Sequence, residues 1–427
     1  MKNLILKHYY INKEVITNLV WRGLQIFGQN GITFMIFILC AKLLPSYDFG
    51  IYNYTLAILS LLILFGDFGI SAATSKYVAE YCVIDKEKIK GVLFNSGIII
   101  LGITLLITIF TLLVGPGYLK EKYTYVLLLL PLIFLAPISS LYDGIYRGLK
   151  KFKQLAVISM IVGTISIPFV YLLIKSYGLF GALISQNLFY FILVLCLGFG
   201  YKEFNFKIDK TIIKKIGTYS FIIGLGSIGF YMFSRIDIIF LGHYGFIEQI
   251  NYFEIINKIL MLFLIPTAMF SQVISPDITA IYFKRDYFKL MEKFKKYLLF
   301  SLIFSLTSVI LIFLFSKLLL SSFLSEYNNQ TMINIIYLML IVFFTQFLNG
   351  VIPSMSTATG HAKLNTAFLI IFGIFHVILN YVFINAYGFM GIVYSIIVTK
   401  VLTDSLFIYS YYNILNKLKL ENSNIIS

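Results

Sequence analysis

Long apolar segments, each joined to the next by a short polar stretch, follow one another along the whole chain. The clearest pair is joined at residues 45–48, and its second apolar run, 49–65, ends on Gly66-Asp67-Phe68-Gly69. A hydrocarbon core of about 30 Å is crossed by roughly 20 helical residues, and lipid offers no partner to an unpaired backbone group. The chain is therefore predicted to be an all-α integral membrane protein.

Composition supports this prediction and sets the number of spans. The 427 residues are 59% hydrophobic and 12% charged, whereas about a quarter of the residues in a soluble globule are charged. The three cysteines show no CxxC or metal-ligand spacing, so neither a disulfide framework nor a zinc site is predicted. Apolar runs of spanning length predict twelve transmembrane helices, over residues 17–42, 50–74, 91–114, 124–141, 155–175, 179–200, 217–241, 251–275, 297–320, 331–352, 366–385 and 391–413.

The basic residues test this span assignment, because they gather in cytoplasmic loops of membrane proteins. With twelve spans both termini lie on one side, and 25 of the 34 lysines and arginines fall on that side. We therefore expect both termini of this multi-pass protein to lie in the cytoplasm. The formal charge of +15 is then expected to face anionic lipid headgroups and not nucleic acid.

The chain repeats itself. Residues 171–181 and 381–391 share the pattern Tyr-x9-Gly with an internal Tyr-Gly-x-x-Gly, at an offset of 210 residues. Since each half holds six spans, the halves are expected to be parallel repeats, related by a pseudo-two-fold axis along the membrane normal. The predicted organisation is an N-terminal lobe (1–200), a cytoplasmic linker (201–216) and a C-terminal lobe with the cytoplasmic tail (217–427), with substrate bound between the lobes.

Several motifs together resemble those of a known family. Residues 41–52, 66–71 and 146–153 and the two Tyr-Gly-x-x-Gly turns are similar to the polysaccharide and O-antigen flippases of the multidrug/oligosaccharidyl-lipid/polysaccharide (MOP) exporter superfamily. The resemblance implies a MATE-like fold with two six-helix bundles and alternating access. It also implies transport of a polyprenyl-diphosphate-linked glycan, such as a surface polysaccharide or O-antigen repeat unit, from the cytoplasmic to the outer leaflet of the bacterial inner (plasma) membrane.

Ionisable residues inside the spans are the main functional signal, because a charge at mid-bilayer is costly unless it faces protein or water. In the first span Arg22, Gln25 and Gln29 share one helix face, which favours a wet cavity lining, although Arg22 near the span's end could also extend to the cytoplasmic surface. Asp67 lies at a similar depth and could pair with Arg22. A structural role in the Gly-Asp-Phe-Gly helix end is the alternative for Asp67.

In the second lobe the cations Arg235, Lys258 and Lys400 accompany nearby acids. Glu254 precedes Lys258 by four residues and Asp404 follows Lys400 by four, so local neutralisation is the alternative to a role in substrate binding. We expect Arg235, Lys258 and Lys400, with Asn257 beside Lys258, to line the cavity. Of the histidines only His376 lies within a span, where it could carry a proton or simply pack.

The sequence leaves two transport functions open. A lipid-linked oligosaccharide flippase needs cations for the diphosphate, whereas a drug or organic cation antiporter of the same superfamily needs an acidic cavity. No phosphate-binding loop for ATP occurs, so energy is expected from an ion gradient, H⁺ or Na⁺, with Asp67, Glu254 and Asp404 as coupling candidates, or from product consumption. No cofactor or metal site is predicted.

A membrane-embedded polymerase or glycosyltransferase is disfavoured, because the longest outer loop, 321–331, holds only one acid. We expect a monomer that could contact a polysaccharide polymerase or assembly proteins.

Overall fold

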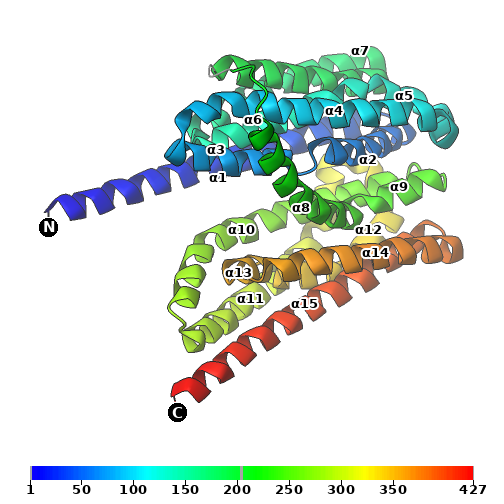
Figure 1. Cartoon of the computed structure of the whole chain (residues 1–427). Helices are drawn as coiled ribbons and strands as arrows, with labels where there is room; N and C mark the ends of the chain where they lie inside the picture. Colours follow the sequence, from blue (N-terminus) through cyan, green and yellow to red (C-terminus); the bar gives the residue numbers. More distant parts are fainter. Residues whose placement is uncertain (1, 202–204, 427) are drawn as a thin grey trace. The chain divides into compact units, whose positions relative to one another are not determined.

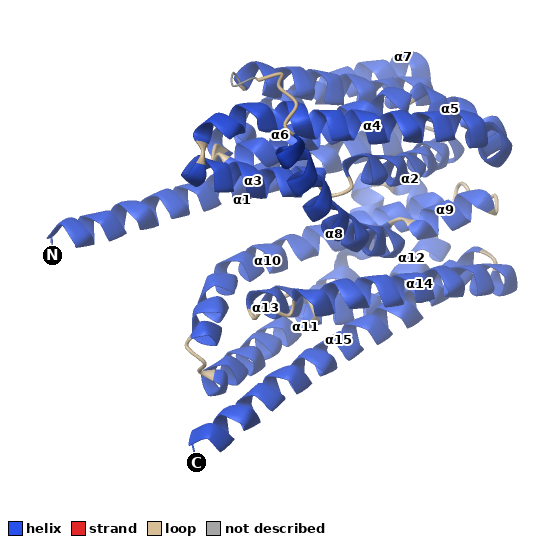
Figure 2. Ribbon diagram, in the orientation of Figure 1, coloured by secondary structure: helices blue, strands red, loops and turns tan. Residues whose placement is uncertain are grey.

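The computed structural model describes residues 2–201 and 205–426. Side chains are described for all of these residues except 2–16, 18–19, 272–273, 276 and 422–426. Helices and loops make up this part of the chain, and no strand occurs in it (Figure 2). The helices are α1 (Lys2–Leu43), α2 (Ser46–Asp67), α3 (Ile70–Ile84), α4 (Lys86–Leu119), α5 (Tyr123–Leu128), α6 (Leu130–Gly148), α7 (Phe152–Gly200), α8 (Lys210–Ser234), α9 (Ile236–His243), α10 (Ile250–Phe283), α11 (Tyr287–Phe323), α12 (Gln330–Leu348), α13 (Ile352–Ala358), α14 (Ala362–Tyr387) and α15 (Phe389–Ile426), with single 3₁₀ turns at Lys120–Lys122 and Ser325–Tyr327 (Figure 1).

The helix lengths confirm the predicted all-α membrane fold. In the described residues, ten helical segments are long and apolar enough to cross a membrane. One of them, α7, bends at Gly178 and so contains two of the predicted spans. The predicted fourth span corresponds to α5 and α6, which are separated at Leu129 just before Pro131. The structure is therefore consistent with twelve spans.

The chain divides into two compact units, residues 1–228 and 229–427. The division falls inside α8 and not in the predicted linker at 201–216. A physical reason is that the described end of that linker is fastened within the first unit. The buried Asn95 side chain of α4 donates to the Lys207 carbonyl (3.0 Å) and accepts from the Asp209 N–H (2.8 Å).

Asp209 immediately precedes α8 and binds its first turn. Its carboxylate accepts from the backbone N–H groups of Thr211 (2.8 Å) and Ile212 (3.3 Å), two of the unpaired donors at this helix start. Slight burial opposes ionisation of this carboxyl, but these hydrogen bonds outweigh it and hold the pKa of Asp209 below its usual range.

The sequence repeat is also a backbone repeat. Gly178 bends α7 with φ 54° and ψ −130°, and Gly388, 210 residues later, separates α14 from α15 with φ 61° and ψ −145°. Three residues after each bend, a glycine lies against the preceding helix arm. A Cβ atom on Gly181 would lie 1.9 Å from one backbone carbonyl oxygen, and one on Gly391 would lie 2.0 Å from another. Both Tyr-Gly-x-x-Gly motifs therefore form the same tight helical hairpin.

In the first unit, glycines bring α3 and α6 into backbone contact. A Cβ atom on Gly144 would lie 2.3 Å from the Ser71 carbonyl oxygen, and one on Gly148 would lie 2.7 Å from that of Ser75. Two small residues four apart on one helix face permit this close approach in a membrane. The neighbouring residues of α6, Asp143 and Arg147, are thereby fixed in position.

The second unit is organised around α15. This helix packs along α14 and α12, and α11 packs along α12. The last turns of α8 approach α14 closely, since a Cβ atom on Gly229 would lie 2.8 Å from the Leu369 backbone. This approach brings the residues that follow α8 within reach of polar side chains on α14 and α15.

Candidate functional site

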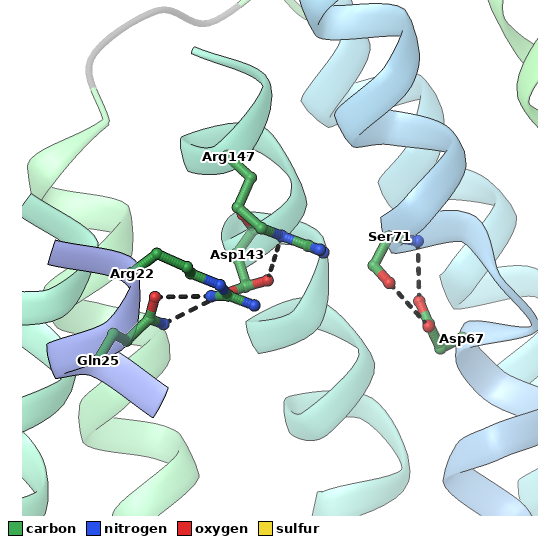
Figure 3. Close-up of polar contacts among 6 residues, drawn as sticks. All are labelled: Arg22, Gln25, Asp67, Ser71, Asp143 and Arg147. Atoms are coloured by element: carbon green, nitrogen blue, oxygen red, sulfur yellow. Dashed lines mark hydrogen bonds and ion pairs between the residues drawn. The ribbon is translucent and has the colours of Figure 1, made fainter. Parts of the chain in front are cut away.

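A carboxylate with two arginines forms the main polar cluster of the first unit (Figure 3). Arg147 Nε lies 2.6 Å from Asp143 Oδ2, and Arg22 Nη1 lies 3.6 Å from Asp143 Oδ1. The three side chains are each between 27% and 30% exposed, so the cluster is partly accessible. Two guanidinium charges against one carboxylate leave one positive charge in excess.

The elements of the fold explain how the cluster assembles. Arg147 and Asp143 are four residues apart and share one face of α6. Gln25, only 1% exposed, connects α1 to them: its Oε1 accepts from Arg22 Nη1 (2.6 Å), and its Nε2 donates to Asp143 Oδ1 (3.4 Å). Gln25 therefore holds the Arg22 guanidinium in place, whereas Gln29, one turn further along α1, is exposed.

Asp67 does not pair with Arg22, as the sequence had suggested it could. Its carboxylate accepts from the backbone N–H (3.0 Å) and the hydroxyl (2.9 Å) of Ser71, within the break between α2 and α3 (Figure 3). Phe68 and Gly69, the two residues of this break, both have left-handed backbone conformations, with φ 36° and 80°. Asp67 thus satisfies donors at the start of α3, which matches the structural alternative for the Gly-Asp-Phe-Gly motif.

Sequence reasoning missed Asp143. It lies just beyond the predicted fourth span, 124–141, and so was not counted among the charges within the membrane. The available signal was its spacing of four residues before Arg147, which already belonged to a motif of interest. The residue 118 positions earlier that contacts it, Gln25, could not be inferred from that spacing.

In the second unit Arg235 and Glu254 form an ion pair. Arg235 interrupts the helix between α8 and α9, and its guanidinium donates to the Glu254 carboxylate on α10, which is 4% exposed. Besides the local interaction with Lys258 that the spacing predicted, Glu254 thus makes a contact between helices, and Lys258 is acted on electrostatically by both members of the ion pair. Asn257 is exposed.

Asp237 lies at the centre of a buried network that the sequence did not reveal. Its Oδ1 contacts His376 Nε2 (2.8 Å) and accepts from Asn380 Nδ2 (2.7 Å), both on α14. The other ring nitrogen of His376 lies 3.1 Å from the Thr399 hydroxyl and 3.3 Å from the Ser395 hydroxyl, both on α15. Asp237 is 9% exposed and the other four residues are fully buried.

The second acid on α15 makes a separate contact. Asp404 Oδ1 accepts from Asn349 Nδ2 at 2.8 Å, and the two residues are 8% and 9% exposed. The Lys400 ammonium lies 4.5 Å from the centroid of the Phe233 ring, in a cation–π contact. The predicted partners Lys400 and Asp404 therefore interact electrostatically, without a direct hydrogen bond between them.

Within the part of the chain that the structure describes, no group of three or more His, Cys, Asp or Glu side chains could hold a metal ion. The polar chemistry of both units is instead that of ion pairs and hydrogen-bonded carboxylates. Such groups can bind an anion through free guanidinium donors, or bind and release a proton.

Comparison with known families identifies the chain. Residues 15–281, more than half of it, match the model of the polysaccharide biosynthesis protein family. The chain belongs to this family. A further relative, an uncharacterized membrane protein of Methanocaldococcus jannaschii, is 26% identical over 393 residues, which cover 87% of this chain and 92% of that protein. This membership confirms the family resemblance found in the sequence motifs.

Solved structures with a similar fold are those of transporters. The inward-facing structure of a multidrug resistance MATE family transporter of the MOP superfamily matches with a TM-score of 0.79 at 17% identity, covering 92% of this chain and 95% of that one. An outward-facing structure of such a transporter matches with a TM-score of 0.66, also at 17% identity, covering 95% and 96%.

A third structure, of a MOP superfamily transporter from Pyrococcus furiosus described by the reverse polarity of its binding pocket, matches with a TM-score of 0.62 at 17% identity. It covers 95% of this chain and 96% of that one. The fold is thus that of the MOP transporters, a multi-pass membrane protein.

Proposed function

We propose that this protein is a flippase, which moves a lipid-diphosphate-linked oligosaccharide from the cytoplasmic to the outer leaflet of the plasma membrane by ion-coupled alternating access. Membership in the polysaccharide biosynthesis family supports the substrate class. The observation that carries the proposal is the cluster of Arg22, Asp143 and Arg147 in the first unit.

The cluster has the chemistry of a diphosphate site. A guanidinium presents five donors in a planar fork that matches phosphate oxygens. Asp143 and Gln25 use only part of the donors of Arg22 and Arg147, so a phosphate group can displace the carboxylate or share the guanidiniums with it. Within the cluster the two guanidiniums outnumber the one carboxylate, and Asp67, the further acid that interacts electrostatically with Arg147, is hydrogen-bonded to Ser71. This local sign favours the flippase over a cation exporter.

Reconstitution into proteoliposomes tests this function. The substrate is a polyprenyl-diphosphate-linked oligosaccharide with a fluorescent sugar, and flipping is measured as the fraction that an impermeant glycosidase can reach. Arg147→Lys keeps the charge but loses the planar fork, and loss of about 1.4 kcal/mol of binding would reduce the rate at limiting substrate roughly tenfold. Arg22→Gln should reduce it at least as much.

Lys153→Gln is the matched control, because Lys153 is a nearby cation that lies 5.5 Å from the Trp21 ring centroid and outside the cluster. Its rate should equal that of the wild type. Wild-type rates in Arg147→Lys and Arg22→Gln as well as in the control, at equal protein abundance in the liposomes, would contradict the proposed site. An absence of flipping by the wild-type protein would contradict the function itself.

A drug or organic cation antiporter is the second candidate, and the likeness to the multidrug resistance MATE transporters favours it. That function would place the substrate on acids, such as Glu254 or Asp404, and not on Arg22 and Arg147. Efflux of a cationic dye from the same proteoliposomes, unaffected by Arg147→Lys, would support this candidate against the flippase.

We propose in addition that the protein acts as a monomer with both termini cytoplasmic. In that arrangement the basic loops contact anionic headgroups, and a polysaccharide polymerase or assembly protein takes the glycan on the outer side. The residues of the second unit that we propose to bind substrate are Arg235, Asn257, Lys258 and Lys400. All three coupling candidates are hydrogen-bonded, Asp67 to Ser71, Glu254 to Arg235 and Asp404 to Asn349. Among the described acids of this set, Asp404 keeps a buried oxygen, Oδ2, that has no hydrogen-bond partner, and it is therefore the best placed.

A further inference from the structure

Asp404 has an unused acceptor. Its Oδ1 is occupied by Asn349, but its Oδ2 is buried and, within the described part of the chain, has no hydrogen-bond partner. The Oδ1 atom of Asn349 is in the same state. An unsatisfied buried carboxylate oxygen is costly, so this position is suited to receive a proton or a cation.

Lys400 places a cation four residues before Asp404, on the same face of the same helix. Its ammonium is acted on by Asp404 on α15 and by Asp237 on α9. It lies over Phe233, whose other neighbour is the His376 ring, stacked at 5.9 Å with an interplanar angle of 7°. Among the described residues no acceptor is hydrogen-bonded to Lys400 Nζ. The ammonium therefore interacts electrostatically with two carboxylates and is hydrogen-bonded to neither.

The group of Asp237, Asp404, Lys400 and His376 has one more negative than positive charge when both acids are ionised. Asp237 and Asp404 carry two negative charges and Lys400 carries one positive charge, while His376 is neutral unless both its ring nitrogens are protonated. The neighbouring charges belong to a separate set on α10, where Glu254 is paired with Arg235 and Lys258 interacts electrostatically with both. The described side chains that α12 and the turn after it place against Asp404 are uncharged, namely Thr345 and Asn349. One additional proton makes the group neutral.

The ligands fit a proton better than a metal cation. Asn380 donates its amide N–H to Asp237, and His376 presents a ring nitrogen to the same oxygen, whereas Na⁺ or Ca²⁺ requires several converging oxygen acceptors. The Lys400 ammonium also repels a second cation. Asp404 and Asn349 contribute two free oxygen atoms, and Asn380 has a third beside Asp237. Neither set supplies the several oxygen ligands that a metal ion requires.

We propose that the coupling ion is a proton bound at Asp404 Oδ2, and that Lys400 is the tethered counter-cation that exchanges between the two acids. With Asp404 protonated, Lys400 is drawn to Asp237. When the proton leaves to water, Lys400 is drawn to the ionised Asp404, four residues along the same helix. Proton binding thereby changes the partner of the ammonium. With Asp404 protonated, Lys400 connects α15 to α9, and with Asp404 ionised, its interaction stays within α15. The inference rests on the proposed function only in calling this proton a coupling ion.

Infrared difference spectroscopy of the purified full chain in lipid nanodiscs tests the proposal without any substrate. Raising the pH should remove a carboxylic acid C=O band in the wild type, because Asp404 ionises. Asp404→Asn should lack that band. Lys400→Met, which removes the nearby positive charge, should retain the band to higher pH by about one unit or more. Lys400→Arg keeps a cation and should titrate close to the wild type.

Asp286→Asn is the control, because Asp286 is an exposed carboxylate whose side chain accepts from the Lys289 N–H outside the group; its band should match the wild type. A band that survives in Asp404→Asn would overturn the proposal, and so would a band that Na⁺ removes at constant pH. Thermal unfolding of each variant identifies any that fail to fold, in which case Lys400→Arg and Lys400→Met decide alone. Failure of the flippase assay leaves this spectroscopic result unaffected.

Discussion

Asp143 occupies the place where an anionic ligand would be expected. Its two oxygens face Arg147 at 2.6 Å and Arg22 at 3.6 Å, and a phosphate group would make contacts of the same kind. An internal carboxylate keeps two neighbouring guanidiniums from repelling each other when no ligand is present. It also competes with the ligand, so that affinity for the ligand is set by the difference between the two.

Replacing this carboxylate tests the competition. In Asp143→Asn, inorganic pyrophosphate should bind roughly five-fold more tightly, because loss of a partly exposed ion pair removes about 1 kcal/mol of competing interaction. The measurement is the rise in melting temperature of the detergent-solubilised protein with pyrophosphate concentration. The double variant with Arg22→Gln should lose the gain. A single variant that binds pyrophosphate no better than the wild type would contradict the competition.

At the level of helices, the two Tyr-Gly-x-x-Gly hairpins need glycine for two different reasons. Gly178 and Gly388 adopt positive φ with ψ of −130° and −145°, a backbone region that side-chain-bearing residues rarely adopt. Gly181 and Gly391 have no space for a Cβ atom. The first pair is constrained by the backbone and the second by contact, so the pattern is kept by geometry in both halves.

Gly178→Ala and Gly388→Ala should each destabilise the protein by about 1 to 3 kcal/mol, the usual cost of a strained backbone position. Gly178 has nothing within 4 Å of a built Cβ atom, so strain is its only cost. The free energy of unfolding in a mixed-micelle denaturant titration provides the measurement. Gly97→Ala, at an uncrowded helical position of α4, is the control and should cause no loss. A neutral Gly178→Ala would refute the strain argument.

For the whole molecule, charge distribution and helix length together determine topology. Ten segments of the described chain can cross a membrane by length and composition, and α7 bends into two arms. The basic residues lie mainly on one side of the predicted twelve-span arrangement. Because translocating Lys and Arg is unfavourable, that side is expected to remain cytoplasmic.

Labelling of single cysteines with an impermeant maleimide in intact cells tests this topology. In a background in which Cys40, Cys82 and Cys196 are replaced, Glu326→Cys should be labelled from outside. Lys86→Cys should be labelled only after the membrane is made permeable. The reverse pattern would show that the predicted orientation is inverted, and labelling of both from outside would show that the number of intervening spans is wrong.

Much of the fold was predictable because its causes are local in sequence. Apolar length gave the membrane helices, and the repeated glycine motif gave the paired hairpins. The pairing of the buried charges was less predictable. Local spacing suggested Glu254 with Lys258 and Lys400 with Asp404, but it did not indicate the further contacts of Glu254 with Arg235 and of Asp404 with Asn349.

The sequence alone determined which side chains carry a charge into the membrane, since a polar residue in an apolar run is visible without coordinates. Tertiary structure decided which of them meet. Asp237 and His376 are 139 residues apart and Gln25 and Asp143 are 118 apart, and only helix packing brings such residues together. The physical reason is that a buried charge must be compensated by some partner, and that requirement does not specify where along the chain the partner lies.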